Sequence, residues 1–107
     1  MTVKNIINHI DKIKPNTFDF ETKLLWLSEV DGRAQIEIYG KDANEVEVPS
    51  GENANLLIPD AYAEAYVYYV VAMIDFLCGE FDRYSASSRA YNKVISDYAK
   101  YVIRGGK

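Results

Sequence analysis

The longest apolar stretch of the chain lies at residues 56–78, and three acids interrupt it: Asp60, Glu64 and Asp75. In a helix that turns about 100° per residue, these acids fall within an arc of about 60°, and large apolar side chains occupy the opposite side. The pattern predicts a helix up to residue 78, with Pro59 in its first turn and Gly79 ending it. A helix that is apolar on nearly all sides must be covered on nearly all sides. We therefore expect other copies of the chain to supply part of the cover.

Two large side chains lie beside or within the acidic stripe of this helix, where a solvated monomer would carry polar groups: Tyr68 and Val71. Tyr101, near the end of the chain, also faces away from the predicted inner face of its helix. Exposed aromatic patches mark interaction sites. These positions predict self-association. A membrane helix is not expected, because the uncharged core at 65–74 is far shorter than the ~20 residues that cross a bilayer.

The N-terminal residues predict a short first helix. Thr2 is a suitable N-cap, and Lys14-Pro15-Asn16 ends the helix, since proline lacks an N–H donor and restricts the residue before it. The helical spacing predicts one apolar face made of Val3, Ile6, Ile7, Ile10 and Ile13.

A second helix is predicted over 18–39, with Thr17 as its N-cap and Gly40 as a left-handed C-cap. Its inner positions continue at spacings of four and three residues: Phe20, Leu24, Leu27, Asp31, Ala34 and Ile38. An interior Gly32 costs about 1 kcal/mol relative to alanine, so we expect a neighbouring helix to approach closely there. The alternative ends the helix at 31–32 and makes 34–39 a strand.

Residues 41–55 are the least apolar part of the chain. The alternation at 46–48 is compatible with a brief edge strand. A loop of this length in a small domain is either an interaction arm or a mobile connector, and both alternatives stay open.

A fourth helix is predicted over 80–104, with 105–107 as a frayed tail. Its inner stripe consists of Phe81, Tyr84, Ser88, Tyr91, Ile95, Tyr98 and Val102. The opposite face gathers charges from Asp82, Arg89, Lys93, Asp97, Lys100 and Arg104. The chain is therefore predicted to be one all-α domain over 1–107, a four-helix bundle-like subunit with a long helical hairpin in its C-terminal half.

Composition narrows the function classes. A chain of 107 residues with a net charge of −4 suits one domain and does not favour non-specific attraction to nucleic acid, although a local basic patch is compatible with it. The single cysteine, Cys78, cannot form an intrachain disulfide, and its neighbours Phe76 and Leu77 suggest a buried small hydrophobe. The N-terminus shows no signal-peptide pattern, so a cytoplasmic, non-secreted protein is expected.

No catalytic, cofactor-binding or metal-binding constellation emerges from the sequence. The one histidine, His9, and the one cysteine fall on different predicted helices, so no nucleophile–base pair is apparent. There is no phosphate-binding loop and no zinc-type spacing. A non-enzymatic protein without cofactor or metal is expected.

The order of motifs resembles small structural proteins of tailed phages and prophages. The resemblance rests on Trp26-Leu27-Ser28-Glu29-Val30-Asp31-Gly32-Arg33, on Leu56-Leu57-Ile58-Pro59 before a tyrosine-rich helix, on Ala72-Met73-Ile74-Asp75-Phe76, on Gly79-Glu80-Phe81-Asp82-Arg83-Tyr84, and on Tyr91-Asn92. In this respect the chain resembles head–tail connector, or head completion, proteins. The resemblance implies an all-helical subunit whose ring lies beneath the portal, in the virion or in the host cytoplasm during assembly. It implies as partners other copies of the chain, a portal protein and a tail-completion protein, with the genome DNA only as passing cargo.

A ring needs two different, matching faces on each subunit. One predicted face combines the acidic stripe with the two side chains beside it: Asp60, Glu64, Tyr68, Val71 and Asp75. The other is the basic face of the last helix: Arg89, Lys93, Lys100 and Arg104. An acidic chain also suits a channel through which DNA slides.

Two other classes stay open. One is a small helical DNA-binding regulator, although no Gly-containing turn followed by a basic recognition helix is apparent. The other is a helical adaptor or antitoxin-type interaction module.

Overall fold

The computed structural model describes residues 1–106, and its four α-helices confirm the predicted all-α fold. The helices are α1 (Val3–Ile13), α2 (Phe20–Glu37), α3 (Glu64–Leu77) and α4 (Phe81–Ile103), with short 3-10 turns at Ala43–Glu45 (η1) and Asp60–Tyr62 (η2). Between residues 1 and 106 there is no strand, and the one isolated β-bridge pairs Thr2 with Asn55.

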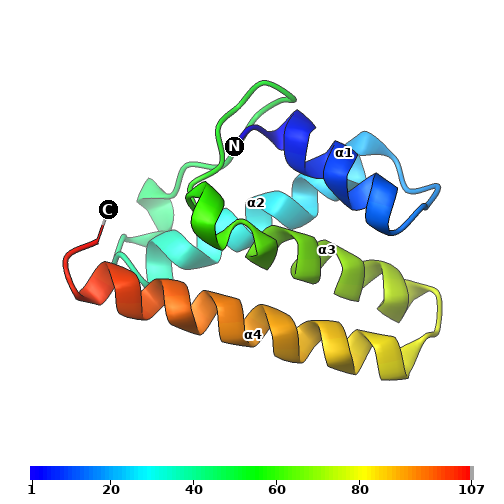
Figure 1. The fold of residues 1–107 in the computed structure, drawn as a ribbon. Coiled ribbons are helices and arrows are strands. Elements are labelled where there is room, and N and C mark those ends of the chain that lie inside the picture. Colours follow the sequence, from blue (N-terminus) through cyan, green and yellow to red (C-terminus); the bar gives the residue numbers. More distant parts are fainter. Residues whose placement is uncertain (107) are drawn as a thin grey trace.

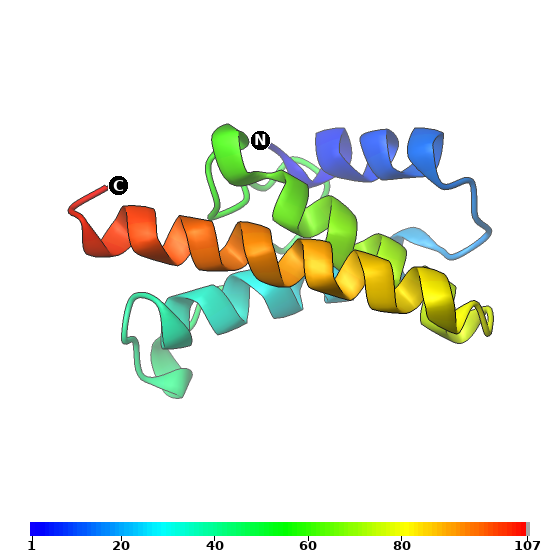
Figure 2. The same ribbon diagram turned by 60° about the horizontal axis from the view of Figure 1, so that its bottom comes forward.

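Helix α3 is the centre of the molecule. It packs against α4 along an antiparallel hairpin and also contacts α2 and α1 (Figure 1). In Figure 2, α1 and α2 run above and below α3, and α4 passes in front of it. Gly79 forms the hairpin turn with a φ of +76°, a left-handed conformation that glycine adopts without steric cost. The predicted helical hairpin is therefore present.

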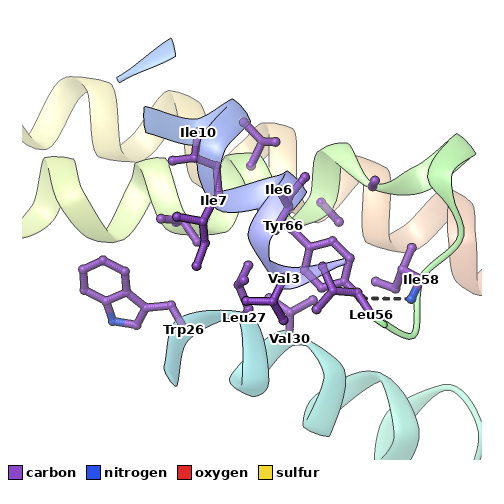
Figure 3. Packing of buried hydrophobic residues seen from close by; sticks show 14 of the residues in the cluster. Val3, Ile6, Ile7, Ile10, Trp26, Leu27, Val30, Leu56, Ile58 and Tyr66 are labelled. Carbon is purple, nitrogen blue, oxygen red and sulfur yellow. Dashed lines mark hydrogen bonds between the residues drawn. The ribbon is translucent and has the colours of Figure 1, made fainter. Parts of the chain in front are cut away.

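The core lies where α1, α2, α3 and residues 56–58 meet (Figure 3). Helix α1 starts at Thr2, whose Oγ1 accepts a hydrogen bond from Asn5 N at 3.2 Å. Its buried side chains are Val3, Ile6, Ile7 and Ile10. Ile13, predicted on the same face, is 55% exposed, because α1 ends there and the chain turns away from the core.

Helix α2 runs without a break across Gly32, so the alternative with a strand at 34–39 is excluded. Its N-cap is Asp19 rather than Thr17: Asp19 Oδ1 accepts from Thr22 N at 2.8 Å. Gly40 follows with a φ of +71°. The expected close approach of a helix at Gly32 is wrong, since a Cβ built there would meet Val46 and Val48 from the loop, at 3.6 and 4.0 Å.

The loop at 41–55 is hydrogen-bonded at its middle and near its C-terminal end. The Gln35 side chain on α2 bonds both the N–H and the carbonyl of Glu47. Near the C-terminal end of the loop, Ala54 O accepts from Val3 N at 3.0 Å, and Glu52 O accepts from Lys4 N at 2.8 Å. The predicted edge strand at 46–48 is absent, because these residues pack on α2 and pair with no neighbouring strand.

Helix α4 is the most exposed of the four. Tyr98 is its one buried side chain. Phe81, predicted at the start of the inner stripe, is 60% exposed, because it lies at the hairpin turn where α3 ends; its ring packs against that of Phe76. After α4, Gly105 and Gly106 donate to the carbonyls of Val102 and Tyr101, so the predicted fraying is wrong for these two residues. Lys107, the rest of the predicted tail, lies outside the described residues.

Candidate functional site

The acidic stripe predicted on α3 does not reach the last turn of the helix. Asp75 is 1% exposed, and its Oδ1 lies 2.8 Å from Nζ of Lys14, which follows α1. Hydrogen bonding to Asp75 raises the pKa of Lys14. The prediction that Asp75 lies in a surface interface is therefore wrong. The Asp75 carboxylate is buried, and the Lys14 ammonium from the end of α1 compensates its charge.

The remaining members of this predicted face differ in exposure. Asp60 and Glu64 are exposed, whereas Tyr68 and Val71 are half-buried. Asp60 Oδ1 lies 3.1 Å from the N-terminal ammonium.

The predicted basic residues all lie exposed on or just after α4: Arg89, Lys93, Lys100 and Arg104. Lys93 pairs with Asp97 at 3.2 Å. The rings of Tyr98 and Tyr101 on α4 lie 5.4 and 5.5 Å from that of Tyr62, in η2. Asp60 and η2 therefore lie near the C-terminal end of α4, where Lys100 and Arg104 also lie.

The largest exposed apolar cluster on α3 and α4 is at the opposite end of the hairpin. We define the hairpin tip as residues 76–81, where Phe76 is 48%, Leu77 55% and Phe81 60% exposed. The Phe76 ring lies 5.8 Å from that of Phe81 and 5.2 Å from that of Tyr84. Cys78 is also exposed, contrary to the expected burial, because α3 ends here and the turn carries it into solvent.

Hydrogen bonds and ion pairs hold the hairpin tip in place. Glu80 N donates to Asp75 O at 2.8 Å, and Gly79 N donates to Phe76 O at 3.1 Å. The Glu80 carboxylate lies 3.4 Å from Lys14 Nζ and 3.2 Å from Arg83 Nη1. The apolar side chains of the tip are thus presented by an ordered turn that is tied to the end of α1.

A groove runs between α2 and α4, with α3 as its floor. It consists of two adjoining hollows of about 480 and 320 Å³, which share Arg33, Tyr91 and Asn92. We call this feature the α2–α4 groove. Its apolar lining comes from half-buried side chains on all three helices: Ile38, Tyr69, Met73, Tyr84, Tyr91 and Ile95.

Polar contacts fix the aromatic floor of the groove. The Tyr69 hydroxyl donates to Glu29 Oε1 at 3.0 Å, and its ring centroid lies 6.0 Å from the Arg33 guanidinium and 5.2 Å from the Tyr91 ring. Burial, together with the hydrogen bond to Glu29, raises the pKa of Tyr69 to about 12. Burial also raises the pKa of Tyr91. Both hydroxyls therefore stay neutral near neutral pH.

A second polar cluster, between α2, α3 and the loop, was not predicted as a site. Asp31 is buried and accepts hydrogen bonds from the Tyr66 hydroxyl and from Leu57 N, while the same hydroxyl accepts from Ile58 N at 2.9 Å (Figure 3 draws this last bond). Burial raises the pKa of Asp31, and its two hydrogen bonds oppose that rise. This cluster joins residues 57–58 to the core. The sequence signal for this cluster was Asp31, an acid at an inner and otherwise apolar position of the predicted second helix.

The sequence also contained a signal for the hairpin tip. An apolar run that ends at a left-handed glycine places its last side chains at a turn, and turns lie at the surface. The α2–α4 groove had no comparable signal, since it depends on how far two helices lie apart in space.

Within residues 1–106, no group of three histidine, cysteine or acidic side chains is arranged to hold a metal ion. In the same part of the chain, no helix combines the length and the apolar character that a bilayer crossing requires. Comparison with protein-family models, with curated proteins and with solved structures found no match to this chain.

Proposed function

We propose that this chain is a non-enzymatic structural subunit that works by associating with other copies of itself. Among such proteins, we propose a head–tail connector of a tailed phage or prophage. Its ring would lie beneath the portal, extend the DNA channel and offer a platform to a tail-completion protein. The order of motifs in the sequence is the basis for choosing this class.

The hairpin tip is the observation that carries the proposal of self-association. Phe76, Leu77 and Phe81 are adjacent large apolar side chains, and each is about half exposed or more. A contiguous apolar cluster of this kind marks an interaction surface, whereas single exposed apolar residues are ordinary. Burying these side chains against a neighbouring subunit would stabilise an assembly.

The charge distribution supports contacts between unlike surfaces. Residues 42–64 carry six acids and no lysine or arginine, whereas α4 carries four basic side chains and two acidic ones. Complementary surfaces on one chain favour heterologous contacts, the type of contact from which a ring is built. The net charge of −4 favours a channel that DNA passes through without being held.

Light scattering over a range of concentrations, with and without the portal protein, tests the proposal. A large assembly of discrete mass that binds the portal is the expected result. A protein that stays monomeric at all concentrations and does not bind the portal would contradict it.

A gel-shift with duplex DNA tests the regulator alternative. We expect no shift at moderate salt. A salt-sensitive shift by a dimer would favour the regulator and remove the support for a connector.

A further inference from the structure

We infer that the hairpin tip of one copy docks into the α2–α4 groove of the next copy. This inference rests on the proposed self-assembly and names the two surfaces that would form its contact. The occupant of the groove is thus a second copy of this chain.

The two features have opposite shapes. The tip is the turn at the end of the hairpin, on the same side of the molecule as the loop that follows α1 (Figure 1), and its apolar side chains are exposed there. The groove is a hollow between two helices that both pack on α3. An exposed apolar turn complements a hollow better than it complements a second exposed turn. This difference favours a contact between unlike surfaces.

The lining of the groove suits aromatic and aliphatic side chains. Tyr69, Tyr91 and Met73 form an aromatic and thioether floor, and such side chains are enriched at protein interfaces. The incoming Phe76, Leu77 and Phe81 would gain the apolar cover that their own chain does not provide. Edge-to-face packing of rings adds a further favourable contribution.

The charges at the tip and at the groove are compatible. The α2 side of the groove carries Glu37 and Arg33, both exposed. The tip carries Glu80, and the exposed Arg83 lies one turn further on. Glu80 already pairs with Lys14 and Arg83 of its own chain, and α2 carries a side chain of opposite sign to each charge of the tip. The α4 side presents Ser88, Asn92 and Ser96, which are neutral and offer hydrogen bonds without repulsion.

The contact would extend from copy to copy. The groove begins beside the tip of its own subunit, where Tyr84 contacts Phe76, and continues to Ile38 and Ala99. An incoming tip would occupy the shared middle part, around Tyr91 and Asn92. Since each subunit offers one tip and one groove, every copy would bind two neighbours, as a closed ring requires.

Disulfide cross-linking tests this geometry directly, because the exposed Cys78 in the tip is the only cysteine of the chain. The Asn92→Cys variant places a second thiol in the middle of the groove. A disulfide forms only when two Cα atoms come within about 7 Å. Under mild oxidation, we expect this variant to form a ladder of covalent multimers, and we expect the unchanged chain to form none.

Asn8→Cys is the matched control, because Asn8 is an exposed asparagine on α1. An equal ladder from this variant would show random collisions and overturn the inference. Efficient Cys78–Cys78 dimers without an Asn92→Cys ladder would show a symmetric tip-to-tip contact instead. An assembly seen by light scattering, with or without portal, that yields no ladder would leave the proposed function standing and overturn this contact alone. A chain that never assembles would overturn both.

Two charge reversals on α4 distinguish the contact between tip and groove from an interface formed by the basic face that the sequence predicts. Arg83→Glu alters the edge of the tip, whereas Arg89→Glu alters an exposed residue that lines neither the tip nor the groove. We expect Arg83→Glu to raise the concentration needed for assembly by about tenfold, a change of about 1.4 kcal/mol. We expect Arg89→Glu to leave it unchanged. The reverse result would overturn the inference.

Discussion

Helices α1 and α4 differ in how completely the chain covers them. Helix α1 has 11 residues and buries four apolar side chains, whereas α4 has 23 residues, of which Tyr98 is the one buried. Helix α1 lies against both α2 and α3, while α4 packs chiefly along α3. The number of neighbouring elements, and not helix length, decides how much of an apolar face is buried.

The same contrast runs along α3. Its first turns are enclosed, with Tyr66 and Val70 fully buried, whereas its last turn exposes Phe76 and Leu77. The half of the molecule that contains α1 therefore supplies most of the apolar burial. The hairpin end instead carries apolar surface that a neighbouring molecule can cover.

The largest expected effect is in the core of the α1 side. Ile10→Ala removes a fully buried side chain and should lower the free energy of unfolding by about 2–5 kcal/mol. Ile103→Ala, at the end of α4, removes a side chain that is 80% exposed and should change it by about 0.5 kcal/mol or less. Urea unfolding followed by circular dichroism measures both. Equal losses would contradict the contrast between α1 and α4.

The ion pair between Lys14 and Asp75 joins the two regions. Lys14→Met should cost about 3 kcal/mol, because it leaves the buried Asp75 carboxylate without its cation. Lys12→Met, at an exposed position of α1, is the control and should cost little. Combining Lys14→Met with Asp75→Asn should recover part of the loss in denaturant unfolding. Loss of the same size in the control would show that the effect comes from α1 charge alone.

The Tyr66 hydroxyl is a smaller contribution on the enclosed side. Tyr66→Phe leaves Asp31 Oδ1 and the Ile58 N–H each without a partner, while Asp31 Oδ2 keeps its bond from Leu57 N, and should cost about 1–3 kcal/mol. Tyr84→Phe, at the hairpin end, is the matched control and should be nearly neutral. Thermal unfolding of both variants checks the prediction, and a neutral Tyr66→Phe would contradict the structural role given to this cluster.

The smallest effect is a pH dependence from Asp31. Burial raises the pKa of Asp31 above 3.8, so the folded chain holds this proton more tightly than the unfolded chain. Its contribution to stability is therefore largest below pH 3.8 and is lost as pH rises through the raised pKa. Urea titrations at several pH values measure the free energy of unfolding of the unchanged chain and of Asp31→Asn. The value for the unchanged chain minus that for the variant should fall as pH rises across this range. A difference that is constant or rises with pH would contradict the assignment.

Local rules explain which parts of this fold could be predicted. The apolar spacing of α1, its Thr2 cap, the register of α2 across Gly32 and the turn at Gly79 all depend on residues close in sequence. The burial of Asp75 could not be predicted, because its cation, Lys14, comes from the end of another helix.

Apolar periodicity also has a limit at the hairpin end. It shows which face of a helix is apolar, but it does not show whether anything covers that face. Phe81 and Ile13 fit the predicted inner faces and are nevertheless exposed, since no element of the chain extends over them. The α2–α4 groove depends on the spacing between two helices and likewise has no local signal.

Solution mass is the most direct test of the central claim that the hairpin tip is covered by another subunit. The variant Phe76→Ser with Phe81→Ser should remain folded, with the helical content of the unchanged chain by circular dichroism, and should be monomeric. The unchanged chain and an Ile103→Ser control should both assemble, by light scattering at matched concentrations. An unchanged chain that is monomeric even with portal, or a serine variant that assembles as well as the control, would contradict the claim.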